Sequence, residues 1–284
     1  MTVPRRRGEL ARVAAVSEVS FNYLWHLVTV PVSVNGIDSR FVLDSGIGLT
    51  LLRSELAEST GVRPSAASFT GRRMSGQSVT IPLAEIPTMT FAGSTCELVE
   101  VGVLDMSSFP ADLAGIGGFL SLAFFADRPI TVDYGRGVVI VETLETLAAR
   151  YADGVPVSVD VQRDGPSVTM FMPLTIPGGR SISVEIDMGS DELILDERLA
   201  EETGASLDGD GVRRVEGTDE TGHAYTRTFT RLAGRIHPTT AAHLAQDDPD
   251  VMFQRIIHDG LLGHAFLRQH VVTFDVAGAA IVLG

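Results

Sequence analysis

Cysteine is nearly absent from this chain, and this limits the classes of protein to which the chain can belong. The 284 residues include one cysteine, Cys96, so no disulfide can form within the chain. A disulfide-framed secreted domain is therefore excluded, and we expect a cytoplasmic protein. Cys96 lies between Thr95 and Glu97 with no nearby histidine to favour its thiolate. We interpret it as a structural thiol and not as a nucleophile.

Long apolar runs and positive charge are also scarce. No stretch approaches the roughly 18 apolar residues of a membrane span, and the N-terminus lacks the apolar segment of a signal peptide. The chain has 22 basic and 36 acidic residues, a net charge of -14, which disfavours nucleic-acid binding. The three arginines at residues 5–7 are interpreted as part of a solvated tail, residues 1–12. We expect neither a nucleic-acid partner nor a membrane partner.

Motifs for metals and cofactors are missing as well. The seven histidines have no partner at the spacing that zinc sites use. Residues 208–211 look like the start of a calcium loop, but Asp219 stands where such a loop needs its final glutamate. Residues 115–118 lack the full spacing of a dinucleotide-binding turn, because Ser121 and not a glycine follows three residues after Gly118. We therefore expect no metal and no cofactor.

Short runs of valine, isoleucine, leucine and threonine, separated by many glycines, make up most of the chain. Hydrophobic residues account for 44% of the sequence, which is enough for a substantial core. Residues 30–34 alternate apolar and polar side chains, as half-buried strands do. These short β-branched runs between glycines predict an all-β protein with few helices.

An internal repeat divides the sequence in two. At an offset of 143, residues 41–46 align with residues 184–189, and five of the six residues at 56–61 are identical to those at 199–204. These matches predict one unit at residues 13–142 and a second at residues 155–284. A linker at residues 143–154 joins them.

Each unit is expected to follow the same plan. An apolar strand ends in an aspartate turn, and a short helix at residues 55–60 or 197–203 follows it. Gly61 and Gly204 end these helices as left-handed caps. A polar, glycine-bearing hairpin comes next, and two closing strands finish the unit. The fold class is thus two β lobes related by a pseudo-two-fold axis, with one short helix in each lobe.

Asp44 and Asp187 occupy equivalent places at the ends of the two apolar strands. An aspartate there is costly unless it is hydrogen-bonded or functional, and the glycine two residues later permits a tight turn. Packing about a two-fold axis would bring the two turns together. Two adjacent carboxyls would share a proton and could act as general base and general acid on a water molecule. A structural alternative is that each aspartate caps the short helix that follows.

The motifs around these aspartates resemble those of aspartic proteases. Residues 44–46 match the Asp-Thr/Ser-Gly signature, and residues 260–263 with 272–275 are similar to the second signature of bacterial retropepsin-like proteins. Residues 115–118 with 130–133 form the looser counterpart in the first unit. The resemblance implies a β-barrel-type, single-chain version of the dimeric retropepsin arrangement, active as a monomer, with Asp44 and Asp187 as catalytic residues.

The resemblance also assigns supporting residues. Two departures stand out, because Met188 replaces the hydroxyl residue of the second signature and Ile47 is larger than the residue usual after the glycine. The implied turn residues are Ser45, Gly46, Met188 and Gly189, and the implied flap residues are Met74, Ser75, Gly76, Gly217, Thr218 and Gly222.

The predicted function is an aspartic endopeptidase that hydrolyses an extended peptide or protein substrate. A second hypothesis uses the same fold without catalysis, as a peptide-binding or scaffolding protein in which Met188 marks lost chemistry.

Overall fold

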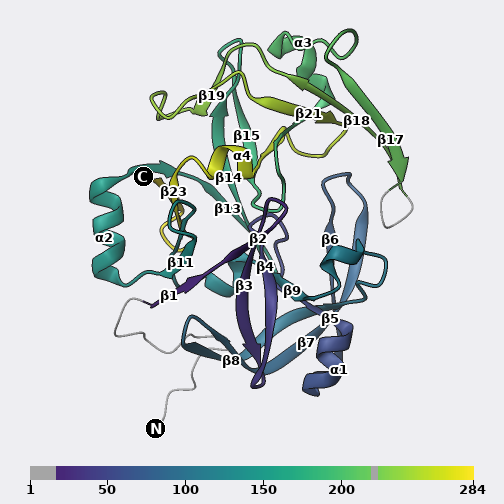
Figure 1. The fold of residues 1–284 in the computed structure, drawn as a ribbon, viewed down its shortest axis with the longest axis vertical. Helices are drawn as coiled ribbons and strands as arrows, with labels where there is room; N and C mark the ends of the chain where they lie inside the picture. The colour runs from purple at the N-terminus through teal and green to yellow at the C-terminus, as the bar shows by residue number, and fades with distance from the viewer. Residues whose placement is uncertain (1–16, 219–222) are drawn as a thin grey trace.

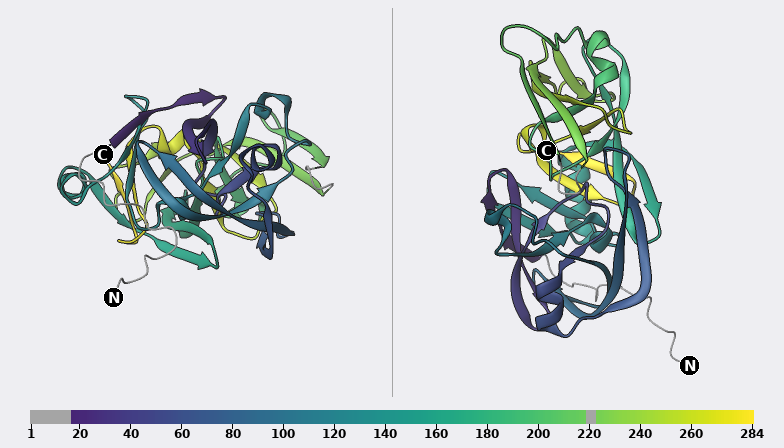
Figure 2. Two further views of the ribbon diagram at one scale, coloured as in Figure 1. Left: turned by 90° about the horizontal axis from the view of Figure 1, so that it is seen from below. Right: turned by 90° about the vertical axis from the view of Figure 1, so that its right-hand side faces the viewer.

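The computed structural model describes residues 17–218 and 223–284. Most of these residues lie in strands, and the chain forms two β lobes joined by a third sheet (Figure 1). Viewed from the side, the lobes are stacked along the long axis of the molecule (Figure 2). The prediction of an all-β, two-lobed fold is confirmed. The predicted tail, residues 1–12, lies outside the described residues.

Lobe 1 is an eight-stranded sheet in the order β2-β3-β4-β9-β5-β8-β7-β6. One helix, α1 (Ser54–Thr60), follows β5, and short 3-10 helices lie at Ala111–Leu113 and Leu122–Phe125. Its strands are β2 (Asn22–Leu24), β3 (Leu27–Val34), β4 (Ile37–Leu43), β5 (Leu51–Arg53), β6 (Pro64–Arg72), β7 (Ser78–Phe91), β8 (Ser94–Leu104) and β9 (Ile116–Leu120).

Lobe 2 repeats this layout in a sheet ordered β17-β18-β21-β16-β22-β15-β14-β19-β20, with β13 paired to β14. Its helical segments are a 3-10 turn at Glu197–Leu199, α3 (Ala200–Thr203) and α4 (His264–Leu267). Its strands are β13 (Asp160–Asp164), β14 (Ser167–Thr175), β15 (Ser181–Ile186), β16 (Leu193–Asp196), β17 (Arg213–Thr218), β18 (Ala224–Arg231), β19 (Arg235–Pro238), β20 (Gln246–Asp247), β21 (Asp250–Gln254) and β22 (Gly260–Leu262).

A six-stranded sheet with strands from both halves of the chain joins the lobes, in the order β1-β11-β10-β23-β24-β12. At its centre Thr131 and Thr273 face each other, and their hydroxyls are 2.7 Å apart. Helix α2 (Leu144–Asp153) connects the halves and is capped at its start by the Thr143 side chain. The strands are β1 (Ser17–Ser20), β10 (Ile130–Asp133), β11 (Val138–Val141), β12 (Val155–Ser158), β23 (Val271–Asp275) and β24 (Ala280–Leu283).

One apolar core runs through both lobes, and side-chain alternation decides which residues enter it. On β4, Phe41 and Leu43 belong to this core, whereas Val42 on the opposite face belongs to a separate cluster. On β15, Val184 and Ile186 likewise enter the main core. Residues at odd steps from these, including both aspartates, therefore face away from the core.

Strand β9 includes residues 116–118 of the motif that the sequence matched to residues 260–263, and the structure shifts that match. The backbone N–H of Asp44 donates to the Leu120 carbonyl at 3.0 Å, and that of Asp187 donates to the Leu262 carbonyl at 3.1 Å. Gly118, not Gly115, is therefore the structural equivalent of Gly260. Both glycines sit where a β-carbon would collide with the backbone of the crossing strand, which explains why glycine occurs at each.

Candidate active site

The two aspartate turns meet at the interface of the lobes. Asp44 follows β4 and Asp187 follows β15, and their exposed fractions are only 7% and 9%. A β-carbon added to Gly46 would lie 2.5 Å from Cγ of Asp187, and one added to Gly189 would lie 2.5 Å from Oδ2 of Asp44. Each carboxyl thus packs directly on the glycine of the opposite turn, in a reciprocal contact that no larger residue would allow.

Backbone and hydroxyl donors hold the two carboxyls in place. Asp44 Oδ1 accepts hydrogen bonds from the N–H groups of Gly46 at 2.9 Å and Ile47 at 3.2 Å. Asp187 Oδ1 accepts from the Gly189 N–H at 2.8 Å, and its Oδ2 accepts from the Ser190 hydroxyl at 2.6 Å. The donors differ because Ser190 stands in lobe 2 where lobe 1 has Ile47. Asp187 therefore has a hydroxyl donor that Asp44 lacks.

Burial and mutual charge set the ionisation of the pair. Burial, reinforced by the neighbouring Asp187 charge, raises the pKa of Asp44 to about 8, although the backbone N–H groups of Gly46 and Ile47 oppose the shift. The two carboxyls are within hydrogen-bonding reach of each other. Two acids so placed retain one proton between them near neutral pH, so one can donate a proton while the other accepts one.

The turns are locked together by one hydroxyl instead of two. Ser45 is fully buried; its hydroxyl donates to the Ile186 carbonyl at 2.6 Å and accepts from the Met188 N–H at 2.9 Å. Met188 has no hydroxyl with which to return these bonds, and its side chain packs in the main core. Ile47 is accommodated at the edge of the lobe 1 cluster.

Helix capping does not explain the two aspartates. The N-cap of α1 is Arg53, and in lobe 2 Asp196 caps the 3-10 turn while Leu199 precedes α3. The alternative interpretation of Asp44 and Asp187 as helix caps is therefore wrong.

The predicted first flap is the β6–β7 hairpin, whose tip, residues 73–77, contacts lobe 2. The Met74 carbonyl accepts a hydrogen bond from the Ile257 N–H at 2.9 Å. The Met74 side chain packs against a small apolar cluster of lobe 2 that includes Ile256 and Leu261. Gly76 has φ +86° and approaches the Ile257 side chain. The flap tip is thus docked on the loop at residues 255–259.

The predicted second flap is the β17–β18 hairpin, in which Gly217 pairs with Tyr225 and Thr218 with Ala224. Gly222 lies outside the described residues. Gly217 lines an open space, while Thr218 extends the hairpin beyond it.

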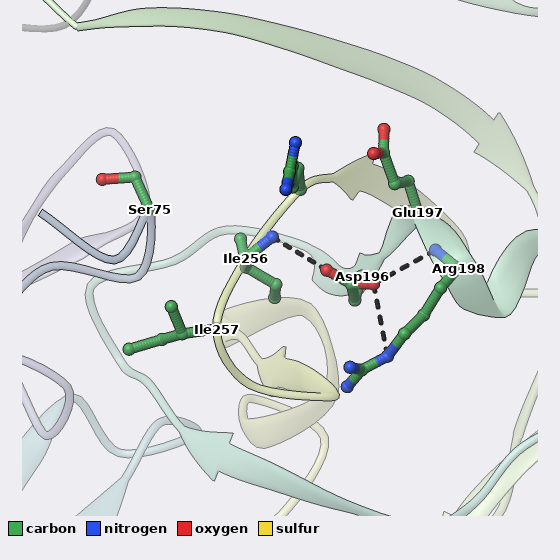
Figure 3. A pocket seen from close by; sticks show the side chains of 7 residues that line it. Ser75, Asp196, Glu197, Arg198, Ile256 and Ile257 are labelled. Atoms are coloured by element: carbon green, nitrogen blue, oxygen red, sulfur yellow. Dashed lines mark hydrogen bonds and ion pairs between the residues drawn. The ribbon is translucent and has the colours of Figure 1, made fainter.

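Two adjoining cavities open between the flaps. The first, of about 660 Å³, lies between Ser75 of the flap tip and residues 196–198 and 255–257 (Figure 3). There the Asp196 carboxylate accepts from the Ile256 N–H at 2.9 Å and pairs with Arg198 at 3.3 Å. The second, of about 690 Å³, lies beside the part of the second flap near its turn, at residues 216–217 and 223–226. Neither of these two cavities is lined by Asp44 or Asp187, and both are lined by Ser75 of the docked flap tip.

Sequence reasoning missed two residues beside the carboxyl pair. Glu185 is 6% exposed and lies two residues before Asp187, on the same face of β15. The sequence did contain a signal for Glu185, because it is a charged residue two positions before the aspartate in an otherwise apolar strand. His26, in the β2–β3 turn of lobe 1, approaches the Gly189 carbonyl with its Nε2 at 3.0 Å. No sequence pattern indicates that His26 of lobe 1 contacts the Gly189 turn of lobe 2.

Other groups have no part in the site. Cys96 is buried, and burial raises the pKa of its thiol to about 12, as the structural interpretation requires. Within residues 17–218 and 223–284, no three potential metal ligands form a group. Over the same residues, every helix is too short or too polar to cross a membrane.

Comparisons with known proteins agree with this geometry. Residues 30–121, which include Asp44, match the family model described as aspartyl protease. Among solved structures, the chain is similar to the crystal structure of conglutin gamma, a unique basic 7S globulin from lupine seeds. The two are 10% identical, with a TM-score of 0.52 over 95% of this chain and 94% of that one. A comparison with curated proteins gives no match. Residues 30–121 of this chain are therefore similar to the aspartyl protease family, and the whole chain shares the two-lobed fold of the conglutin gamma structure.

Proposed function

We propose that the protein is an aspartic endopeptidase in which Asp44 and Asp187 together activate water. The observation that carries the proposal is the reciprocal packing of two buried carboxyls, each against the glycine of the opposite turn. Buried carboxyls with perturbed ionisation are costly, and they are characteristic of catalytic centres. The residues 30–121 that match the aspartyl protease family contribute one of the two turns.

The two carboxyls take different roles. Asp187, whose carboxyl accepts a hydrogen bond from the Ser190 hydroxyl, takes the role of general base and accepts a proton from water. Asp44, whose pKa is raised, keeps its proton near neutral pH and donates it to the carbonyl oxygen of the substrate. Water oxygen bonds to the carbonyl carbon. When the C–N bond breaks, a hydroxyl of the resulting diol returns a proton to Asp44 as its C=O bond re-forms, and the proton held by Asp187 passes to the leaving nitrogen.

The substrate in this proposal is an extended peptide held beneath the two hairpins. The hairpin tip at residues 73–77 is a hydrogen-bonding edge, because its Met74 carbonyl already accepts from Ile257. Opening this contact would admit a peptide, and closing it would exclude water from the reaction. We further propose that the lobes are copies of one unit, at residues 13–142 and 155–284. One chain then supplies both aspartates and acts as a monomer.

A second candidate function is peptide binding without turnover. Met188 favours it, because the turns are joined by the single hydroxyl of Ser45, which leaves the carboxyl geometry less constrained than two hydroxyls would.

Incubation with a diverse peptide library, analysed by mass spectrometry from acidic to neutral pH, tests the proposal. We expect new termini with the wild-type protein. Asp44→Asn and Asp187→Asn should each lower kcat/KM by about 10²- to 10⁴-fold, the usual contribution of a general acid or base. Asp38→Asn, at an exposed position of the same β4 strand, is the matched control. Peptides that bind without any cleavage would favour the second candidate, and cleavage that survives either substitution would refute the paired mechanism.

A further inference from the structure

Glu185 is a third buried carboxyl beside the pair. Two residues along a strand span about 7 Å, so Glu185 lies about that far along the chain from Asp187 and points to the same face. Burial, and then the charges of Asp187 and Asp44, raise the pKa of Glu185 well above its ordinary value. Such a carboxyl gains most from a positive charge brought next to it.

The basic side chain that faces Glu185 is His258, whose Nε2 is 3.8 Å from Oε2 of Glu185, beyond hydrogen-bonding distance. The His258 ring packs against Phe171, with the ring centres 4.9 Å apart, and burial lowers the pKa of His258. The imidazole is therefore a weak counter-ion for the Glu185 carboxyl.

The position of Glu185 links the carboxyl pair to the docked flap. His258 follows Ile257 directly, and Ile257 is the residue that holds the Met74 carbonyl of the flap tip. A peptide bound between the flap and the aspartates would pass this point, with the side chain next to the scissile bond facing Glu185.

Lobe 1 shows that an acidic residue is not required by the fold at this position. The equivalent residue of β4, two before Asp44, is Val42, which is buried in an apolar cluster. A valine would fill the same strand position in lobe 2 without the cost of burying a charge. The presence of an acidic side chain at residue 185 is therefore not explained by the fold and indicates a function.

We propose that Glu185 is a specificity-determining residue that binds the cationic side chain of a lysine or arginine flanking the scissile bond. This inference rests on the proposed peptidase function. Lysine and arginine supply donors to a carboxylate from the end of a long, flexible or forked side chain, as a pocket beside the aspartates would require. The net charge of -14 acts in the same direction, because it attracts basic peptides over a long range.

Matched peptides that differ only by lysine or norleucine on either side of the cleaved bond test the inference. Wild-type protein should cleave the lysine peptide with a kcat/KM at least about tenfold higher, since charge-assisted hydrogen bonds are strong. The ratio should fall to about one in Glu185→Gln. It should invert in favour of norleucine in Glu185→Val, which copies Val42. Glu201→Gln, at an exposed position of α3, is the control and should keep the wild-type ratio.

A binding arm separates this inference from the peptidase proposal. The same peptides are titrated into Asp44→Asn protein with and without Glu185→Gln. Cleavage without any preference for lysine would overturn the role of Glu185 and leave the peptidase proposal standing. Preferential binding of the lysine peptide that depends on Glu185, without cleavage by wild-type protein, would support the inference and overturn the peptidase. Neither cleavage nor selective binding would overturn both.

Discussion

The two lobes present different surfaces to the aspartates that they share. Behind Asp44, Val42 sits in an apolar cluster that includes Leu51 and Phe119. Behind Asp187, the equivalent strands carry Ile194 and Leu261 in a smaller cluster. The contrast shows that the two lobes share a strand order but differ in the side chains next to the aspartates.

The smaller cluster of lobe 2 is completed from outside. Met74 of the lobe 1 flap packs on it, whereas the lobe 1 cluster is filled by lobe 1 residues. Lobe 2 also places Glu185 and the Ser190 hydroxyl near the pair, where lobe 1 has Val42 and Ile47. Lobe 1 thus contributes an apolar wall and the flap, and lobe 2 contributes polar groups and the surface on which the flap tip docks.

The largest expected effect tests the part of the site that is the same in both lobes. Gly46→Ala and Gly189→Ala each place a β-carbon about 2.5 Å from the opposite carboxyl. Because displacement of a reacting group by about 1 Å can cost 10²-fold in rate, we expect each variant to lose at least about 100-fold in kcat/KM. Steady-state kinetics with a cleaved peptide measures this. A loss confined to one variant would show that the reciprocal packing is not symmetric in function.

The second prediction concerns the two hydrogen bonds by which the Ser45 hydroxyl of lobe 1 joins the aspartate turns. Ser45→Ala leaves the Met188 N–H and the Ile186 carbonyl buried without their partner. Unpaired buried groups cost about 1–3 kcal/mol each, so we expect the free energy of unfolding to fall by about 2–3 kcal/mol. Met188→Leu removes no hydrogen bond and should cost less than about 1.5 kcal/mol. Urea unfolding compares the two variants, and equal losses would contradict the assignment of the lock to Ser45.

Much of this arrangement could be predicted from the sequence. The repeat located both aspartate turns, and the glycine after each aspartate was correctly associated with close approach. Strand alternation predicted the all-β fold because periodicity is a local property. Helix ends were equally local, and Gly61 and Gly204 are indeed left-handed caps, with φ of +74° and +70°.

Other features depend on contacts that no local pattern records. Residues 115–118 were matched as a motif to residues 260–263, whereas in the structure Gly118 is the residue equivalent to Gly260. Three glycines between residues 115 and 118 satisfied the motif equally well. Only the crossing backbone of β5 selects Gly118. Met74 docks on Ile257 of lobe 2, although the two residues are 183 positions apart in the sequence. This contact follows from the folded arrangement of the lobes.

The third prediction uses the donor that lobe 2 has and lobe 1 lacks. Ser190→Ala removes the hydroxyl that donates to Asp187 at 2.6 Å. The bond fixes the orientation of the carboxyl, and hydrogen bonds to charged groups contribute about 1.5–3 kcal/mol, so its loss should lower kcat/KM by about 10- to 100-fold. The alkaline limb of the kcat/KM profile, where Asp44 with its pKa of about 8 loses its proton, should stay in place. Profiles of both proteins on one peptide measure the rate and this limb, and an unchanged kcat/KM would contradict the role of Ser190.

The smallest effect tests whether the lobes remain equivalent far from the cleft. Gly61 and Gly204 end corresponding helices in the left-handed conformation, with open space around each α-carbon. Alanine at either position should therefore cost about 1 kcal/mol through backbone strain alone, and the double variant should show the sum. Gly115→Ala is the control, because Gly115 also faces open space but has no positive φ. It should leave stability unchanged or raise it slightly. Unequal costs at Gly61 and Gly204 in urea unfolding would mean that the lobes differ in their framework as well as in the side chains that face the cleft.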